Sequence, residues 1–249
     1  MKFSLVTIAK NEGKYIDAFL NHYRTWVNEI VVVDNGSNDA TVSIARRFTN
    51  NVTINAEPRF DTLRQFALKQ AKNDWILLVD VDEFTDETLT KEIKQVMKNP
   101  QFSAYSVTRQ NFFGKHALIG KYGQETFIRL FDKKTVEIKP AIIHDKVETQ
   151  RHVGKLSGHL NHYSYKSVGQ TLRKFTEYNR REALLGTEKV SIRLTHFTAY
   201  PAHMFWSLFV DDKGYQDGLY GFVLAILFAY SEFTKYLFLL LLRNSEKSV

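Results

Sequence analysis

The sequence contains no cysteine, which excludes a disulfide framework and any metal site built on thiolates. This composition suits a reducing compartment. The first residues enter a strand-like segment without the long apolar core of an export signal, so we do not expect export. No internal repeat and no low-complexity linker interrupt the 249 residues, a length that fits one large domain with an appendage.

The sequence also lacks an apolar run long enough to cross a bilayer, which takes roughly 20 residues. Residues 222–230 and 236–242 are apolar, but Glu232 and Lys235 separate them. Aromatic residues beside leucines, with basic residues at Lys235 and Arg243, are typical of a helix that lies at the level of the lipid headgroups. We therefore expect an interfacial helix here, and a buried or oligomer-forming helix is the alternative.

Negative charge is scarce in the second part of the chain. Residues 1–100 carry 13 Lys and Arg against 14 Asp and Glu, whereas residues 101–249 carry 21 against 13, and the whole chain has a net charge of +7. An anionic partner is therefore expected for the second part. Nucleotide phosphates, nucleic acid and an acidic membrane surface all fit this charge.

The most informative stretch runs from residue 75 to residue 83. Residues 75–79 are all apolar, which predicts a strand covered on both faces, and Asp80, Asp82 and Glu83 follow directly. In open α/β sheets ligands bind at this carboxyl edge, and two aspartates at i and i+2 can bind one hard cation such as Mg²⁺ or Mn²⁺. Such a cation would hold a diphosphate. The alternative is that these acids, with Asp86, cap the following helix.

Apolar segments before this stretch alternate between strand and helix patterns, which predicts βαβ units and a parallel nucleotide-binding sheet. Strands are expected at residues 3–8, 30–33, 52–54 and 75–79, with helices at about 15–27, 40–48, after a cap at Asp61, and after a cap near Asp86. Asp34 ends the second strand and would share the edge with Asp80. Shorter strand-like pieces follow at residues 104–107, 127–131 and 136–138, and then a helix at 168–185.

Three segments of the first hundred residues, in this order and spacing, resemble the donor-binding half of family 2 inverting glycosyltransferases. They are residues 7–12 (TIAKNE), 33–41 (VDNGSNDAT) and 74–83 (DWILLVDVDE). A looser match, at residues 129–131, 143–145, 162–165 and the Asp217-Gly218-x-x-Gly221 element, resembles the branch that includes the lipopolysaccharide inner-core β-glucosyltransferases. The resemblance implies an α/β fold of the GT-A type: a Rossmann-like mixed sheet with helices on both faces, plus a helical C-terminal segment that associates with a membrane.

The resemblance also implies roles for individual residues in binding a UDP-sugar and a metal ion. Donor contacts are expected from Thr7, Ala9, Glu12, Asp34, Arg64, Asp80 and Val81, and Mg²⁺ or Mn²⁺ would be held by Asp80 and Asp82. A carboxylate such as that of Asp34 can accept the uracil N–H, and the metal offsets charge as UDP leaves. The alternative for Asp34 and Asp39 is a turn that caps the next helix.

Inversion requires a base that takes the proton from the acceptor hydroxyl. Asp145 is the predicted base. It follows His144 at a position where the branch usually has Glu, so the carboxylate is retained but is one methylene shorter. The alternative is an exposed ion pair of Asp145 with Lys146 or Arg151.

Contacts with the acceptor are expected from Arg129, His144, His162 and Asp217. His159 or His162 could instead supply a nitrogen ligand to the metal, and a hydrogen-bonded core histidine is the ordinary alternative. The glycines after Asp217 indicate either close backbone approach to a ligand or a plain turn.

Together these observations predict a donor-binding half at residues 1–100, an acceptor-binding half at 101–199 and a membrane-interface segment at 200–249. The predicted activity is metal-dependent, inverting transfer of a hexose, with glucose favoured, from a UDP-sugar to a hydroxyl of a lipid-linked saccharide such as the lipopolysaccharide inner core. The protein would lie on the inner face of the cytoplasmic membrane, with no nucleic-acid partner and with its C-terminal helices as a route to homo-oligomers. A nucleotidyltransferase, or a noncatalytic membrane-surface or RNA-binding module, is the alternative; residues 9–13 match the glycine-rich phosphate loop of the former poorly.

Overall fold

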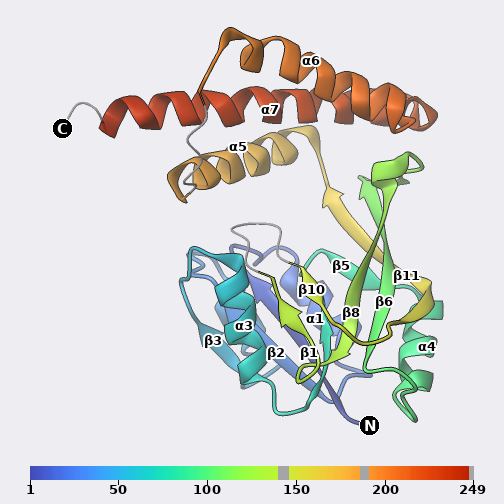
Figure 1. The fold of residues 1–249 in the computed structure, drawn as a ribbon. Coiled ribbons are helices and arrows are strands. Elements are labelled where there is room, and N and C mark those ends of the chain that lie inside the picture. The colour runs from blue at the N-terminus through green and yellow to red at the C-terminus, as the bar shows by residue number, and fades with distance from the viewer. Residues whose placement is uncertain (140–145, 186–190, 247–249) are drawn as a thin grey trace. The chain divides into compact units, whose positions relative to one another are not determined.

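The computed structural model describes residues 1–139, 146–185 and 191–246 (Figure 1). The chain divides into two compact units. Unit 1 comprises Met1–Arg109 and Glu125–His162, and unit 2 comprises Gln110–Gln124 and Tyr163–Val249.

Unit 1 opens with four parallel strands in the order β3-β2-β1-β4. They are β1 (Phe3–Ala9), β2 (Glu29–Asp34), β3 (Val52–Ile54) and β4 (Trp75–Leu78). The four predicted parallel strands are thus confirmed. Because the strands run in the same direction, their carboxyl ends, with Ala9, Asp34 and the residues after Leu78, meet at one edge of the sheet.

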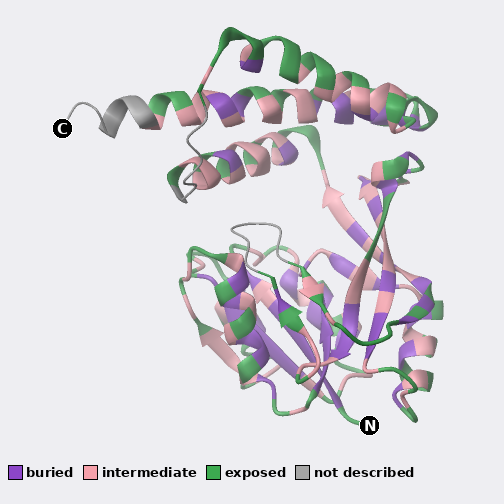
Figure 2. Ribbon diagram, in the orientation of Figure 1, coloured by how far each residue is buried: buried purple, intermediate pink, exposed green. Residues whose placement is uncertain are grey.

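Helices cover both faces of these strands, and this is why the strands read as unbroken apolar runs. Leu5 and Val32 belong to one buried cluster, and Val6 and Val33 belong to the cluster on the other face with Leu63 of α3. The helices of unit 1 are α1 (Ile16–Tyr23), α2 (Thr41–Ala45), α3 (Phe60–Gln70) and α4 (Glu87–Val96). Figure 2 shows the resulting buried residues along β1 and β2.

One of the two predicted helix caps in unit 1 is confirmed and the other is wrong. Asp86 is the N-cap of α4, and its side chain accepts the amide of Leu89 at 2.6 Å. Asp61 instead lies inside the first turn of α3, after the N-cap Arg59, and pairs with the Arg59 guanidinium at 2.7 Å. Placed there, it still lies near the helix N-terminus, where a negative charge is favourable.

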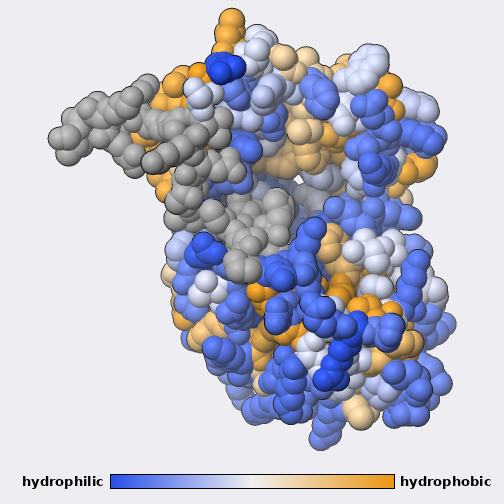
Figure 3. All heavy atoms as spheres, viewed as in Figure 1, coloured by the Kyte–Doolittle hydropathy of each residue, from blue (hydrophilic) through white to orange (hydrophobic). Residues whose placement is uncertain are grey.

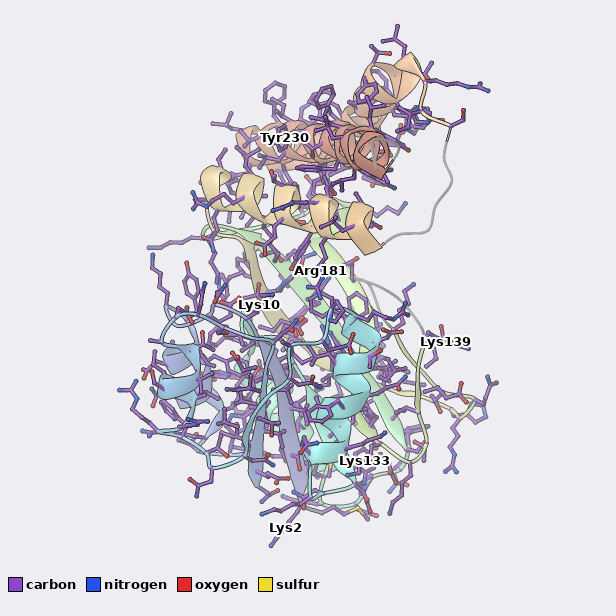
Figure 4. The ribbon with its side chains drawn as sticks, turned by 90° about the vertical axis from the view of Figure 1, so that its left-hand side faces the viewer. Lys2, Lys10, Lys133, Lys139, Arg181 and Tyr230 are labelled. Atoms are coloured by element: carbon purple, nitrogen blue, oxygen red, sulfur yellow. The ribbon has the colours of Figure 1, made fainter. Side chains whose placement is uncertain are left out.

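Beyond β4 the sheet becomes mixed, because β8 (Gln124–Asp132) pairs with β4 in the antiparallel direction. The order continues β8-β6-β11-β5 through β6 (Ala104–Phe113), β11 (Gly154–Tyr165) and β5 (Glu83–Thr85). A separate antiparallel pair is formed by β9 (Glu137–Ile138) and β10 (Val147–Glu148). Lys133, at the end of α3 in Figure 4, donates to Ala71 O at 2.7 Å and ties the end of β8 to that helix.

Unit 2 holds the outer end of β6, the short strand β7 (His116–Ala117) that pairs with it, and a layer of helices. The helices are α5 (Val168–Leu185), α6 (Ala199–Trp206) and α7 (Leu219–Glu246). The short helical turns η2 (Leu194–Phe197), η3 (Ser207–Asp211) and η4 (Gly214–Asp217) lie between them in the chain, and η1 (Lys121–Gly123) follows β7. Buried Asn179 of α5 donates its side-chain amide to Ser231 O at 2.7 Å and to Thr234 Oγ1 at 2.8 Å, which fixes α5 against α7.

The expectation that the C-terminal apolar segment is too short to cross a bilayer is wrong. Residues 219–246 form one continuous helix, and its apolar part, Leu219–Leu242, has the length and composition of a membrane-crossing helix. Ser231, Glu232 and Lys235 interrupt the hydropathy of this segment but not its hydrogen bonding, because none of these residues disfavours a helix strongly. Polar Ser231 and Thr234 meet Asn179, so the interruption lies where α7 packs against α5.

Candidate functional site

An acidic turn follows β4 at the carboxyl edge of unit 1. The amide of Glu83 donates to Asp80 O at 3.0 Å, and the amide of Asp80 donates to Glu83 Oε2 at 2.9 Å. These two hydrogen bonds close the turn from both ends. They hold the carboxylates of Asp80 and Asp82 close enough to interact electrostatically.

Two arginines from separate elements balance the charge of Asp80. Arg64 of α3 lies 3.5 Å from Asp80 Oδ1, and Arg129 of β8 lies 3.4 Å from Asp80 Oδ2. Burial by itself would raise the pKa of Asp80, but the two guanidinium groups outweigh burial and hold this pKa below its usual range. Asp80 therefore stays a carboxylate at neutral pH.

The third acid of the turn, Glu83, is fully buried. Its Oε1 accepts from Arg129 at 2.7 Å and from Arg109 of β6 at 3.4 Å. Both guanidiniums also lie over the ring of Phe127, at 4.6 Å for Arg109 and 5.5 Å for Arg129. Glu83 is thus the buried counter-ion of an arginine pair.

Asp82 meets a histidine from the antiparallel part of the sheet. β5 and β11 pair so that His162 lies opposite Glu83, and His162 Nε2 is 3.4 Å from Asp82 Oδ1. The Asp82 carboxylate can supply an oxygen ligand to Mg²⁺ or Mn²⁺, with substrate phosphates and water as further ligands, and His162 lies where it can contact the ion or a phosphate. Among the residues that the structure describes, no three His, Asp or Glu side chains converge as a complete protein-only metal site.

The loops after β1 and β2 meet at the same edge. Asp34, the last residue of β2, is buried, and its Oδ1 accepts the amide of Ser37 at 2.8 Å while its Oδ2 accepts the Ser37 hydroxyl. The amide of Asn35 donates to Ala9 O at 2.8 Å. Asp34 therefore forms the turn that one of the two interpretations expected, with its carboxylate at the edge of the sheet.

Residues 11–13 are tied to the residues that follow Asp34. Asn11 has a left-handed backbone with φ of 56°, and its amide donates to Ser37 Oγ at 2.8 Å. Asp39 accepts the amides of Gly13 at 2.9 Å and Thr41 at 3.0 Å. Burial acts to raise the pKa of Asp39, but these hydrogen bonds outweigh it and lower the pKa. The two loops form one connected rim beside the acidic turn.

Comparison with known proteins identifies the family of this chain. The model of the family described as Glycosyl transferase family 2 matches residues 4–209, which include the rim, the acidic turn, Arg129 and His162. The chain belongs to glycosyl transferase family 2. This membership confirms the predicted α/β fold of the GT-A type, and among the three predicted functions it selects the glycosyltransferase.

The relatives of this glycosyltransferase include uncharacterised glycosyltransferases of Rickettsia. The one from Rickettsia typhi is 28% identical over 254 residues, which covers 94% of this chain and 85% of the relative. The poly(ribitol-phosphate) β-N-acetylglucosaminyltransferase TarS of Staphylococcus aureus is 31% identical over 104 residues, which covers 37% of this chain and 18% of TarS.

Solved structures similar to this glycosyltransferase include glucosyl-3-phosphoglycerate synthase from Mycobacterium tuberculosis, crystallised with Mg²⁺ and UDP. It is 18% identical, covers 45% of this chain and 43% of its own, and superposes with a TM-score of 0.37. At that score the likeness supports no inference about this chain.

The structure brings five predicted site residues of the glycosyltransferase together. They are Arg64, Asp80, Asp82, Arg129 and His162. Of these, Arg129 and His162 were expected on the acceptor side and in fact contact the acidic turn.

The other predicted donor residues lie on the rim or below it. Thr7 and Val81 are buried, and the Thr7 hydroxyl has no hydrogen-bond partner within the described part of the chain. The amide of Glu12 donates to Thr41 Oγ1 at 2.8 Å. The donor contacts predicted for these residues stay predictions, as does the uracil contact of Asp34. The predicted base Asp145 and its neighbour His144 lie outside the described residues.

Asp217, predicted as an acceptor contact, is a buried residue of unit 2. Its Oδ1 accepts from His116 Nε2 and from the amide of Ile119, both at 2.8 Å, and its Oδ2 accepts from the amide of Gly120 at 3.0 Å and from Tyr122 OH at 3.3 Å. Burial, followed by the charge of Asp217, raises the pKa of Tyr122. These contacts join residues 116–122 to the turn before α7.

Sequence reasoning gave no role to Arg109. It counted Glu83 in the carboxylate cluster after the strand, or as part of a helix cap, without an individual role. The position of Glu83 inside residues 74–83 was the available signal for one of them. For Arg109 the sequence carries no signal, because its contact with Glu83 depends on strand order.

Proposed function

We propose that this glycosyltransferase transfers a hexose, with glucose favoured, from a UDP-sugar to a hydroxyl of a lipid-linked saccharide, with inversion and with the help of Mg²⁺ or Mn²⁺. The observation that carries the donor half of the proposal is the convergence of Asp80, Asp82 and His162 beside Arg64 and Arg129 at the carboxyl edge of the sheet. An acidic pair that faces two guanidinium groups and an imidazole from three other elements suits a negatively charged ligand bound through a divalent ion.

In this proposal Asp80 and Asp82 hold the divalent ion, with His162 beside Asp82 and the two arginines beside Asp80. The ion, when bound, offsets the negative charge that develops as UDP leaves. Arg64 and Arg129, which face Asp80, are the proposed partners that orient the donor phosphates. Asp34 accepts the uracil N–H at the far end of the edge.

Asp145 is proposed as the base that takes the proton of the acceptor hydroxyl while the anomeric carbon is attacked from the opposite face. The proposal for Asp145 rests on the family resemblance of residues 143–145. Asp145→Asn should abolish transfer to the acceptor and leave the affinity for UDP unchanged. Loss of UDP binding in this variant would place Asp145 in the donor site instead.

The donor proposal is tested by UDP release from a panel of UDP-sugars, with and without Mn²⁺ or Mg²⁺. Asp82→Ala should abolish divalent-dependent turnover. Asp74→Ala is the matched control, because Asp74 precedes the same strand at its opposite end and its side chain makes an exposed ion pair with Lys134. If no UDP-sugar binds or turns over, or if Asp82→Ala turns over like Asp74→Ala, the proposal is wrong.

The acceptor is proposed to be membrane-bound because α7 exposes one apolar stripe. Six of its eight exposed apolar residues recur at spacings of three, four and seven, so that they lie on one face of the helix: Leu219, Phe222, Ile226, Tyr230, Phe233 and Leu240. Leu241 flanks this face, and Tyr220 lies outside it. In Figure 3, hydrophobic residues reach the surface of the helical unit. The charged residues Glu232 and Lys235 lie outside this stripe, as the helical spacing requires.

The contacts of α7 with α5 favour a position of α7 on the membrane surface over a helix that crosses the bilayer. α7 packs along α5, where Thr176 Oγ1 lies 3.1 Å from Tyr230 OH. The neighbouring α5 residues Arg173, Glu177 and Arg180 are exposed and charged, and charged side chains are costly inside hydrocarbon. A lipid-linked saccharide with anionic groups, such as the lipopolysaccharide inner core, fits an apolar stripe flanked by arginines at the inner face of the cytoplasmic membrane.

Flotation with vesicles that contain anionic phospholipid tests the membrane proposal. Ile226→Glu should reduce vesicle binding strongly because it places a charge in the middle of the stripe. Ile54→Glu is the control, since Ile54 is similarly exposed but lies on β3 of unit 1. Equal vesicle binding by both variants, or protein that resists release by alkaline carbonate, would contradict a surface position of α7.

A further inference from the structure

Glu83 links the acidic turn to β6, β8 and β11, although its side chain is fully buried. Its carboxylate accepts the Asp80 amide through one oxygen and the Arg129 and Arg109 guanidiniums through the other. Its backbone amide closes the turn by donating to Asp80 O at 3.0 Å. Side chain and backbone of the same residue therefore determine the shape of residues 80–83.

The backbone of Glu83 is held as firmly as its side chain. Tyr23 of α1 is fully buried, and its hydroxyl donates to Glu83 O at 3.1 Å and accepts the Thr85 amide at 3.2 Å. On the other side, Glu83 lies opposite His162 in the ladder between β5 and β11. A displacement of Glu83 would consequently move both Asp82, its chain neighbour, and His162, its partner across the ladder.

Arg129 contacts two carboxylates, those of Glu83 and Asp80. The Arg129 guanidinium is 2.7 Å from Glu83 Oε1 and 3.4 Å from Asp80 Oδ2, so its stronger contact is with Glu83. Removal of the Glu83 charge would leave a buried guanidinium whose nearest carboxylate is Asp80. Arg129 would then compete with the divalent ion for Asp80.

We infer that Glu83 is a positioning residue for the metal-diphosphate site: it fixes the Asp80–Asp82 turn and keeps Arg129 from pairing fully with Asp80. The inference rests on the proposed donor function of the turn. Residues that act through a metal ligand in this way change metal affinity by about 10–100-fold when they are substituted. A purely structural role would lower thermal stability without a specific effect on the metal-dependent part of UDP binding.

The test is calorimetric titration of UDP into wild-type and Glu83→Gln protein, with and without Mn²⁺. Glutamine keeps the size of the side chain but removes its charge. In Glu83→Gln the Mn²⁺-dependent gain in UDP affinity should fall by about 10–100-fold, whereas UDP binding without metal should change little. Glu83→Asp should not restore the gain, because a side chain one methylene shorter cannot span from the Asp80 amide to Arg129.

Glu125→Gln is the matched control. Glu125 pairs with Arg109, as Glu83 does, but it is half exposed and has no contact with residues 80–82 among its recorded partners. Mn²⁺-assisted UDP binding should be retained in this variant. If Mn²⁺ does not assist UDP binding by the wild-type protein, the proposed donor function is wrong. If folded Glu83→Gln binds UDP with the same Mn²⁺-dependent gain as the wild type, only the inference about Glu83 is wrong. If Glu83→Gln does not fold, Arg109→Lys and Arg129→Lys test whether the contacts of Glu83 with these arginines control the Mn²⁺-dependent gain in UDP affinity. A gain equal to that of the wild type in both variants would overturn the inference.

Discussion

Replacement of Asp217 by alanine should unfold one specific part of unit 2. The change removes the acceptor of four donors, of which the Gly120 amide is buried and the other three are partly buried. An unsatisfied buried amide costs about 1–3 kcal/mol. The partly buried donors regain water in part, so we expect a total loss of about 3 kcal/mol in the free energy of unfolding. Asp217→Asn should lose less, because its remaining oxygen still accepts from one pair of donors.

Hydrogen-exchange mass spectrometry of peptides that cover residues 116–123 measures this loss directly, and thermal unfolding measures its effect on the whole protein. Asp212→Asn is the control in the same unit, since Asp212 makes an ion pair with the exposed Lys121 that is worth at most about 1 kcal/mol. Unchanged exchange and melting in Asp217→Ala, together with loss of transfer to the acceptor, would refute this reasoning. That result would establish Asp217 as the acceptor contact that the sequence suggested.

Four further substitutions test other parts of the fold. Gly221→Ala should destabilise the start of α7 severely, because an added Cβ would lie 1.9 Å from Gly214 O. Gly169→Ala in α5 adds a Cβ that meets nothing within 4 Å, so in denaturant titrations it should raise the free energy of unfolding by about 0.5–1 kcal/mol. Burial lowers the pKa of His22 below 6.5, so the unfolded state binds a proton more readily than the folded state. The free energy of unfolding should therefore fall as the pH drops below about 6.5, and His22→Gln should flatten this pH dependence. Asp86→Ala removes the cap of α4 and should cost about 1 kcal/mol in chemical unfolding, and an unchanged midpoint would contradict the cap.

The sequence by itself determined the parallel half of unit 1. Strands buried on both faces have no polar alternation, so residues 75–79 could be recognised without knowledge of their neighbours. The acids after this strand could be placed at a ligand-binding edge for the same reason. Family membership was accessible as well, because its motifs lie on these strand ends in a fixed order.

Tertiary structure alone decided which side chains meet those acids. Arg109, Arg129 and His162 reach the acidic turn through the strand order β8-β6-β11-β5, and no local periodicity reports which antiparallel strands become neighbours. The role of Asp217 was hidden for a similar reason, since its donors His116 to Tyr122 lie about a hundred positions earlier in the chain.

The continuity of α7 was also decided by packing. Hydropathy along the chain separates residues 222–230 from 236–242, but the polar residues between them meet Asn179 of α5 and so stay inside one helix. The hydropathy pattern of a sequence indicates which residues are buried. Only the fold specifies which partner buries it, because contacts between distant segments depend on strand order and helix packing.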